Sequence, residues 1–169
     1  MGERSKATVS GVFRSKEDLV EIINYLEEKG VSENDISVLM SKETQNKHFT
    51  IDTSTKAPDE AFKGLATGSL FGAIIGGLTL VGVVALPGYG LSISGPVVGL
   101  ITGAAAGGLV GTIIGALIGL GIPEHEAKFF EKAVKEKGNV LIAANIDKDI
   151  KSDVKKQFNK YGAFHIATQ

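Results

Sequence analysis

The residues of this chain that could bind a metal or carry out catalysis are few and scattered. There is no cysteine, which excludes thiolate chemistry and a disulfide framework. Glu124, His125 and Glu126 are adjacent and could offer ligands to a metal ion. A metal site needs three or four convergent ligands, however, and His48 and His165 stand apart in the sequence. We interpret the triplet as the acidic start of a helix with an exposed histidine, and we expect neither a metal nor another cofactor.

Two glycine-rich stretches, residues 88–90 and 107–108, could be taken for phosphate-binding loops. Both lack the strand–turn–helix context and the lysine that such loops need. The net charge of −1 provides no bulk basic character for binding nucleic acid. We therefore expect no enzyme activity, no nucleic-acid partner and no small-molecule substrate.

The most regular pattern in the chain is a repeat of glycine at every fourth position. Residues four apart share one face of a helix, so each series would give a helix with a smooth groove along which a second backbone can approach. We predict that these glycines are helix-packing and oligomerisation residues, and that the protein binds copies of itself. The two series are Gly64, Gly68, Gly72 and Gly76, then Gly99, Gly103, Gly107, Gly111, Gly115 and Gly119.

The glycine series lie in a stretch, residues 64–123, that contains no charged side chain. Pro87-Gly88 and Gly95-Pro96 divide this stretch into two apolar segments, 64–86 and 97–122. Each segment reaches the ~20 residues that a helix needs to cross a bilayer, so the sequence predicts a transmembrane helical hairpin. Lysines flank the hairpin and its turn is uncharged, which predicts by the positive-inside rule that both flanks face the cytoplasm.

The first flank has the pattern of a βαβ unit. Residues 7–13 are rich in β-branched and aromatic side chains, residues 36–40 alternate apolar with polar, and each range predicts a strand. Between them, apolar residues at helical spacing follow an N-cap at Ser15 and end before Gly30, which predicts a helix. The polar residues 41–57 that follow predict a loop.

The second flank repeats this order of elements. A helix after Pro123 is followed by a predicted strand over 140–146, a helix that ends at Gly162 and a last strand over 164–166. Neither flank is large enough to bury a core alone. Together they predict an α+β fold, a ferredoxin-like βαβ–βαβ sheet domain split by a long apolar glycine-zipper helical hairpin. The predicted boundaries are 1–57 for the first half with its loop, 58–122 for the hairpin, and 123–169 for the linking helix and second half.

Several motifs along the chain match one protein family. Over nearly its whole length the sequence resembles the bacterial general stress proteins, also called heat-induced or low-temperature-induced stress proteins. The resemblance implies a stress-associated, membrane-associated bacterial protein with no established enzyme activity, and it supplies no catalytic residues. The matching motifs are Val9–Phe13 followed by Ser15–Leu19, Leu26–Val31, Asp35–Val38, Leu86–Gly88, Gly95-Pro96, Gly119–Glu124 with Glu126-Ala127, and Gly138 with Val140–Ile142.

Three functions remain open on this interpretation. The one we predict is a non-enzymatic stress-associated protein of the bacterial inner membrane, in contact with lipid, which self-associates through its hairpins and has a cytoplasmic domain. The second is an oligomeric pore or channel, against which the absence of ionisable residues in the hairpin counts. The third is a soluble cytoplasmic homo-oligomer whose hairpins form a protein-buried core, since a uniformly apolar helix fits a large protein interior as well as a bilayer.

Overall fold

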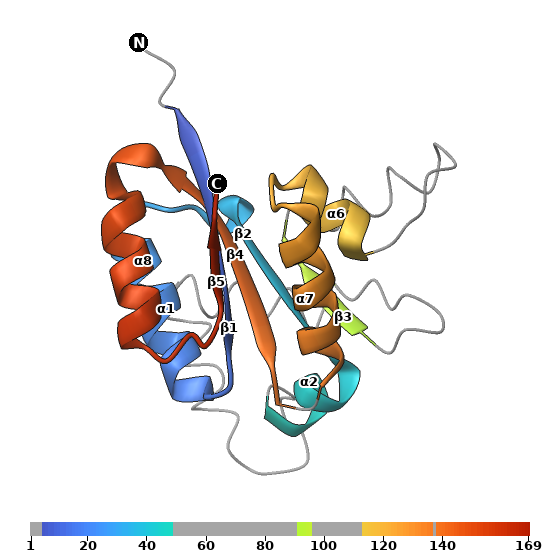
Figure 1. Cartoon of the computed structure of the whole chain (residues 1–169). Coiled ribbons are helices and arrows are strands. Elements are labelled where there is room, and N and C mark those ends of the chain that lie inside the picture. The colour runs from blue at the N-terminus through green and yellow to red at the C-terminus, as the bar shows by residue number, and fades with distance from the viewer. Residues whose placement is uncertain (1–4, 49–90, 96–112, 137) are drawn as a thin grey trace.

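The computed structural model describes residues 5–48, 91–95, 113–136 and 138–169. In these residues the chain is an α+β protein whose strands form one sheet, with helices on both sides of it (Figure 1). The elements are β1 (Lys6–Phe13), α1 (Lys16–Glu28), η1 (Glu33–Asp35), β2 (Ile36–Ser41), α2 (Lys42–His48), β3 (Leu91–Ser94), α6 (Ile113–Gly119), α7 (Glu124–Lys135), β4 (Val140–Asp147), η2 (Lys148–Ile150), α8 (Lys151–Lys160) and β5 (Ile166–Thr168).

The sheet has five strands in the order β3-β2-β4-β1-β5, and every neighbouring pair is antiparallel. β1 and β4 pair along their full length, from Lys6 opposite Asp147 to Phe13 opposite Val140. β2 pairs with the other edge of β4, and β5 with the other edge of β1. Strands from before and after the apolar region of the sequence therefore alternate in a single sheet.

α1 and α8 cover one face of this sheet (Figure 1). The rings of Phe13 and Phe158 meet edge to face there, with centroids 5.3 Å apart. Gly11 in β1 makes room for this contact, because a Cβ at that position would lie 2.7 Å from the Phe158 ring. The first core, as we call it, includes Val9, Phe13, Leu19, Ile22, Ile23, Leu26, Val38, Ile142, Val154 and Phe158.

The helices of this face begin and end at residues that the sequence predicts. The Ser15 hydroxyl accepts a hydrogen bond from the backbone N–H of Asp18 at 3.3 Å, which is an N-cap for α1. Gly30 follows α1 in the left-handed conformation, with φ +77°. Gly162 ends α8 in the same way, with φ +76°. The predictions made for Ser15, Gly30 and Gly162 are confirmed.

α6 and α7 cover the opposite face of the sheet (Figure 1). α7 begins directly after Pro123, as predicted. Because the sheet is covered on both faces, β4 is buried at every position from Val140 to Ala144, which explains its continuous apolar run. The second core, on this face, includes Val12, Leu39, Ile113, Ala116, Leu117, Ala127, Phe130, Val134 and Leu141.

Residues 42–48 form helix α2, where the sequence predicts part of a polar loop. The Ser41 hydroxyl at the end of β2 accepts the backbone N–H of Thr44 at 3.1 Å. The Thr44 hydroxyl in turn accepts the N–H of Gly138 at 2.9 Å, which joins α2 to the turn before β4. The loop prediction is wrong here because a serine cap stabilises a helix of polar composition; residues 49–57 lie outside the described residues.

β3 lies inside the predicted turn of the hairpin. It pairs with β2 in antiparallel register, with Ser94 opposite Val38. Gly95, directly after β3, has φ +87°, and a Cβ on it would lie 2.1 Å from the carbonyl oxygen of Ile36. This glycine therefore permits the close approach of the chain to β2, in addition to the positive φ that other residues rarely adopt.

α6 is the end of the second predicted membrane span. It ends at Gly119, because Gly121 has φ +88° and the N–H of Ile122 returns to the carbonyl of Leu117 at 3.0 Å. Leu117 and Ile122 are both buried in the second core.

No helix within the described ranges is both long enough and apolar enough to cross a membrane. The pairing of β3 adds a geometrical reason, since the turn between two spans would lie ~30 Å across the hydrocarbon layer from the domain whose sheet it joins here. These findings correct the predictions of a transmembrane hairpin and of a membrane-embedded protein, and they leave the predicted inner-membrane location without support. The remainder of the two apolar segments, residues 64–86 and 97–112, lies outside the described residues.

Candidate functional site

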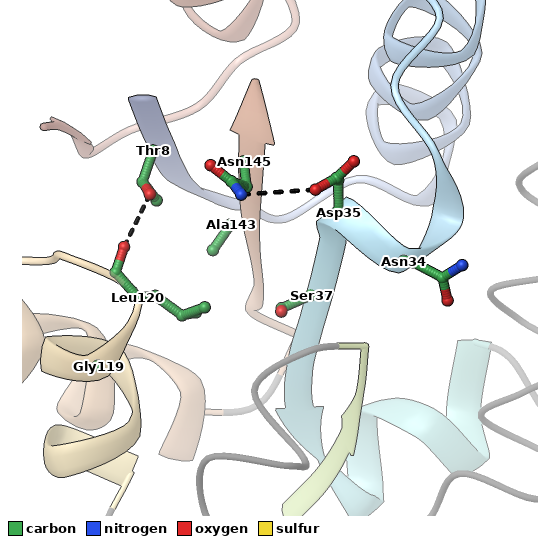
Figure 2. Close-up of a pocket in the computed structure, with 8 residues that line it drawn as sticks. All are labelled: Thr8, Asn34, Asp35, Ser37, Gly119, Leu120, Ala143 and Asn145. Atoms are coloured by element: carbon green, nitrogen blue, oxygen red, sulfur yellow. Dashed lines mark hydrogen bonds between the residues drawn. The ribbon is translucent and has the colours of Figure 1, made fainter. Parts of the chain in front are cut away.

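A polar cavity of about 230 Å³ lies between the end of α6 and the second face of the sheet (Figure 2). Three strands, the short helix η1 and the last turn of α6 contribute to its wall. It combines a hollow with several convergent polar side chains. The residues that line it are Thr8, Asn34, Asp35, Ser37, Gly119, Leu120, Ala143 and Asn145.

The register of the sheet explains why a hollow forms at this position. Ser10 and Ser37 both stand opposite Ala143, so one row across β1, β4 and β2 carries only small side chains on this face. Two residues earlier in β4, Leu141 stands opposite both Val12 and Leu39, and these large side chains fill the second core. The cavity thus begins where large residues give way to small ones.

Hydrogen bonds hold the polar wall of the cavity in place. The Thr8 hydroxyl donates to the carbonyl oxygen of Leu120 at 2.7 Å, which ties β1 to the end of α6. Asn145, which stands opposite Thr8 in the sheet, donates from its amide nitrogen to a carboxylate oxygen of Asp35 at 3.5 Å. Both bonds are drawn in Figure 2. They join residues more than a hundred positions apart in the sequence.

The charged side chains at the cavity and beside it are two carboxylates and one ammonium group. Asp35 is the charged residue in its wall, and its carboxylate is 31% exposed. Lys6 lies between two carboxylates, 3.8 Å from Asp35 and 3.5 Å from Asp147. Two negative groups therefore share one ammonium group. The lining residues offer hydroxyl, amide and carboxylate groups.

Of the glycines predicted to pack helices, the structure describes Gly115 and Gly119, both in α6. They lie on the exposed side of the helix, whereas Ala116 and Leu117 are buried against the sheet. Gly119 also lines the cavity. The other members of the two series, Gly64, Gly68, Gly72, Gly76, Gly99, Gly103, Gly107 and Gly111, lie outside the described residues.

His165 does not stand apart in the structure, although it does in the sequence. Its Nε2 contacts a carboxylate oxygen of Glu126, and the other oxygen of Glu126 is 3.6 Å from His125. The His165 ring also lies against that of Phe129, with centroids 3.9 Å apart. Sequence reasoning missed this contact because 39 positions separate Glu126 from His165 and no motif links the two.

Glu124, the first residue of the acidic triplet, forms an ion pair within α7. Its carboxylate lies 2.6 Å from the ammonium group of Lys128, one turn further along the helix. The hydrogen bond from Lys128, together with its positive charge, lowers the pKa of Glu124 below the usual glutamate range. Among the described residues, no three histidine, aspartate or glutamate side chains are placed to hold a metal ion together.

Comparison with known protein families gives a match over the first half of the chain. The model of the heat induced stress protein YflT domain matches residues 8–86. Within the described residues this range contains β1, α1, β2 and α2. No curated protein and no solved structure matches the chain. The matched range thus holds two strands of the sheet, and β4, which pairs with both, comes from the residues beyond it.

Proposed function

We propose, because residues 8–86 match the model of the heat induced stress protein YflT domain, that the chain is a non-enzymatic stress-associated protein that assembles with copies of itself. In this assembly the glycine-rich apolar segments are buried in protein. Both apolar segments are connected to the α+β domain at each end. The first lies in the sequence between α2 and β3, and the second follows β3 and ends with α6.

The observation that carries the proposal is the two-sided environment of α6. One side of the helix is buried on the sheet through Ala116 and Leu117. The other side carries Gly115, Gly119 and Ile118, whose side chain is 45% exposed. Both described glycines of the series are therefore exposed, Gly115 beside Ile118 and Gly119 at the mouth of the cavity. This exposure supports contact with another helix, because glycine allows two backbones to approach closely.

The composition of the apolar segments supports the same proposal. Residues 64–86 and 97–112 contain no charged side chain. Monomeric soluble proteins rarely expose contiguous apolar surfaces of more than a few hundred Å². A second copy of the chain can bury such a surface, and the repeated glycines supply a self-complementary face for it.

We also propose that the sheet domain is a ferredoxin-like fold that the apolar region splits in two. With β3 set aside, the strand order is β2-β4-β1-β5. The first strands of the two βαβ units, β1 and β4, form the central pair, and each also pairs with the second strand of the other unit, as in a ferredoxin-like sheet. α1 and α8, one from each unit, share the first core. The boundaries at 57/58 and 122/123 belong to this proposal.

The mass and lipid content of the purified full-length particle test the assembly. We expect a particle of several chains by light scattering, of the same mass in mild detergent and without it, and without stoichiometric lipid. Gly107→Leu and Gly111→Leu should each lower the mass, because a side chain on the glycine face keeps the backbones apart. Ala105→Leu is the matched control, since it adds similar bulk outside the four-residue register.

The proposal is contradicted by a monomer, by a mass that neither glycine variant changes, or by Ala105→Leu dissociating the particle as much as they do. Stoichiometric lipid in the particle would also contradict it, because lipid would then cover the apolar segments in place of protein.

A further inference from the structure

Two of the hydrogen-bond donors in the polar cavity beside α6, one N–H of Asn145 and the Thr8 hydroxyl, are already in use. Asn145 donates to Asp35, and Thr8 donates to the carbonyl of Leu120. Because a carboxylate only accepts hydrogen bonds, the amide nitrogen of Asn145 must face Asp35 and its oxygen must face the other way. Figure 2 shows this oxygen turned to the side of Thr8.

The cavity also offers a set of hydrogen-bond acceptors. The Asn145 amide oxygen and the lone pairs of the Thr8 hydroxyl have no hydrogen-bond donor within the described part of the chain. The carboxylate of Asp35 and the carbonyl oxygen of Leu120 each keep further accepting capacity after one bond. A ligand that matches this set must therefore be rich in N–H or O–H donors.

A buried hydroxyl beside the cavity is a second, independent sign of unused hydrogen-bonding capacity. Ser10 is fully buried, and its Oγ has no hydrogen-bond partner among the described residues. It stands opposite Ala143, which lines the cavity, and on the same side of β1 as Thr8. Buried polar atoms without a partner are rare in folded proteins and call for an explanation.

The charge and the volume of the cavity narrow the class of ligand. Its wall contains one carboxylate, from Asp35, and no cationic side chain. Lys6, which does not line the cavity, lies near both Asp35 and Asp147. The volume of about 230 Å³ is below the roughly 300–1,000 Å³ of pockets that take drug-sized ligands. These properties match a small cation.

We propose that this cavity binds a small organic ammonium ion that also carries a hydroxyl group. Its ammonium group donates to the Asp35 carboxylate and to the amide oxygen of Asn145, and its hydroxyl group donates to the Thr8 oxygen. Binding at this position is a further activity of the α+β domain and does not depend on assembly through the glycine series.

Titration of the ¹⁵N-labelled full-length protein with ethanolammonium chloride tests this proposal. We expect saturable shifts of the backbone amides of Thr8, Asp35, Ser37, Leu120 and Asn145. Ethylene glycol, which has the hydroxyl groups without the charge, and sodium chloride at equal ionic strength should leave these amides unshifted. No saturable shift with ethanolammonium, or an equal response to ethylene glycol or sodium chloride, would overturn the proposal.

Two substitutions with opposite expected effects sharpen the test. Asp35→Asn should weaken binding about tenfold or more, because it removes the charged acceptor. Asn145→Asp should tighten binding, because it places a second carboxylate beside the first and the ligand relieves their repulsion. Asp149→Asn, which removes an exposed carboxylate from η2, is the matched control and should leave the affinity unchanged.

Unchanged affinity in Asp35→Asn, or weaker binding in Asn145→Asp, contradicts the proposal. A loss in Asp149→Asn equal to that in Asp35→Asn would do so too, because it would show attraction to the net surface charge alone. If one of the two cavity variants fails to fold, the change in affinity for ethanolammonium in the other still supports or contradicts the proposal.

Discussion

The two faces of the sheet differ in how they are built. The face under α1 and α8 is apolar across β1, β2 and β4, with the Phe13–Phe158 contact in its core. The face under α6 and α7 is apolar only around Leu141 and gives way to the polar cavity beyond Ala143. The first face is closed by helices that lie next to their strands in the sequence. The second face takes α6 from a segment whose composition is that of a membrane span.

The comparison teaches that composition identifies burial but not the medium that provides it. Residues 113–122 are uncharged and apolar, as a bilayer would require, yet they complete a protein core. The difference lies in Gly121, which ends α6 and turns Ile122 back onto Leu117. A glycine in a glycine-rich segment is easily counted as one more packing residue when it is a helix terminus.

The largest effect is expected in the first core. Phe158→Ala should lower the free energy of unfolding by about 3–5 kcal/mol, because the ring is fully buried against Phe13. Urea denaturation measures this loss. Phe129→Ala is the control, since that ring is 38% exposed and should cost clearly less. Equal losses in both variants would mean that the first core is not closed as described.

The next largest loss of stability is expected in the second core, at the residue that anchors α6 to the sheet. Leu117→Ala should lower the free energy of unfolding by about 2–5 kcal/mol, because this side chain of α6 is fully buried. Ile118→Ala, one residue further along the helix, should cost much less because that side chain is 45% exposed. If both substitutions left the urea transition of the domain unchanged, α6 would not be part of it.

A smaller effect is expected from the hydrogen bond that joins β1 to the end of α6 at the cavity. Thr8→Val keeps the shape of the side chain and removes the hydrogen bond to the carbonyl of Leu120. The free energy of unfolding should fall by about 1 kcal/mol. Amide hydrogen exchange should show faster opening at the end of α6 than at α1. Equal acceleration in α1 would indicate general destabilisation instead.

The smallest effect is the pH dependence of the exposed pair in α7. Lys128 lowers the pKa of Glu124, so the pair stabilises the fold only where the Glu124 carboxyl is ionised. Lys128→Ala should therefore cost a little stability at neutral pH, and the difference from the natural protein should vanish as the pH falls through the pKa of Glu124. Thermal unfolding of both proteins, at neutral pH and at a pH below the pKa of Glu124, measures this difference in stability. A difference that grows on acidification would show the opposite linkage.

Local signals predicted the first face. Ser15, Gly30 and Gly162 act within a few residues of their own positions, so a serine before a helix and a glycine after one can be recognised in the sequence. The α+β class followed from the same signals. The period of apolar residues likewise identified the buried side of α1.

The second face and the cavity depend on pairings that no local pattern encodes. β3 is a four-residue strand between turn residues, and only its partner β2 makes it a strand. The cavity exists because Ser10, Ala143 and Ser37 share one row, and this requires the register of three strands that are distant in the sequence. The contact between Glu126 and His165 has the same origin, since it joins α7 to the residue before β5.

The central claim is that the chain returns to the sheet as β3 between its two apolar segments, and one cross-link tests it directly. The protein has no cysteine, so a variant with Val38→Cys and Ser94→Cys contains the only thiols in the chain. These residues stand opposite each other in the sheet, within the distance that a disulfide spans. We predict rapid intramolecular cross-linking on mild oxidation, and much slower cross-linking of an Ile36→Cys, Ser92→Cys control that is out of register. Failure of the Val38–Ser94 pair to cross-link in the folded protein, or equal rates for the two pairs, would contradict the account.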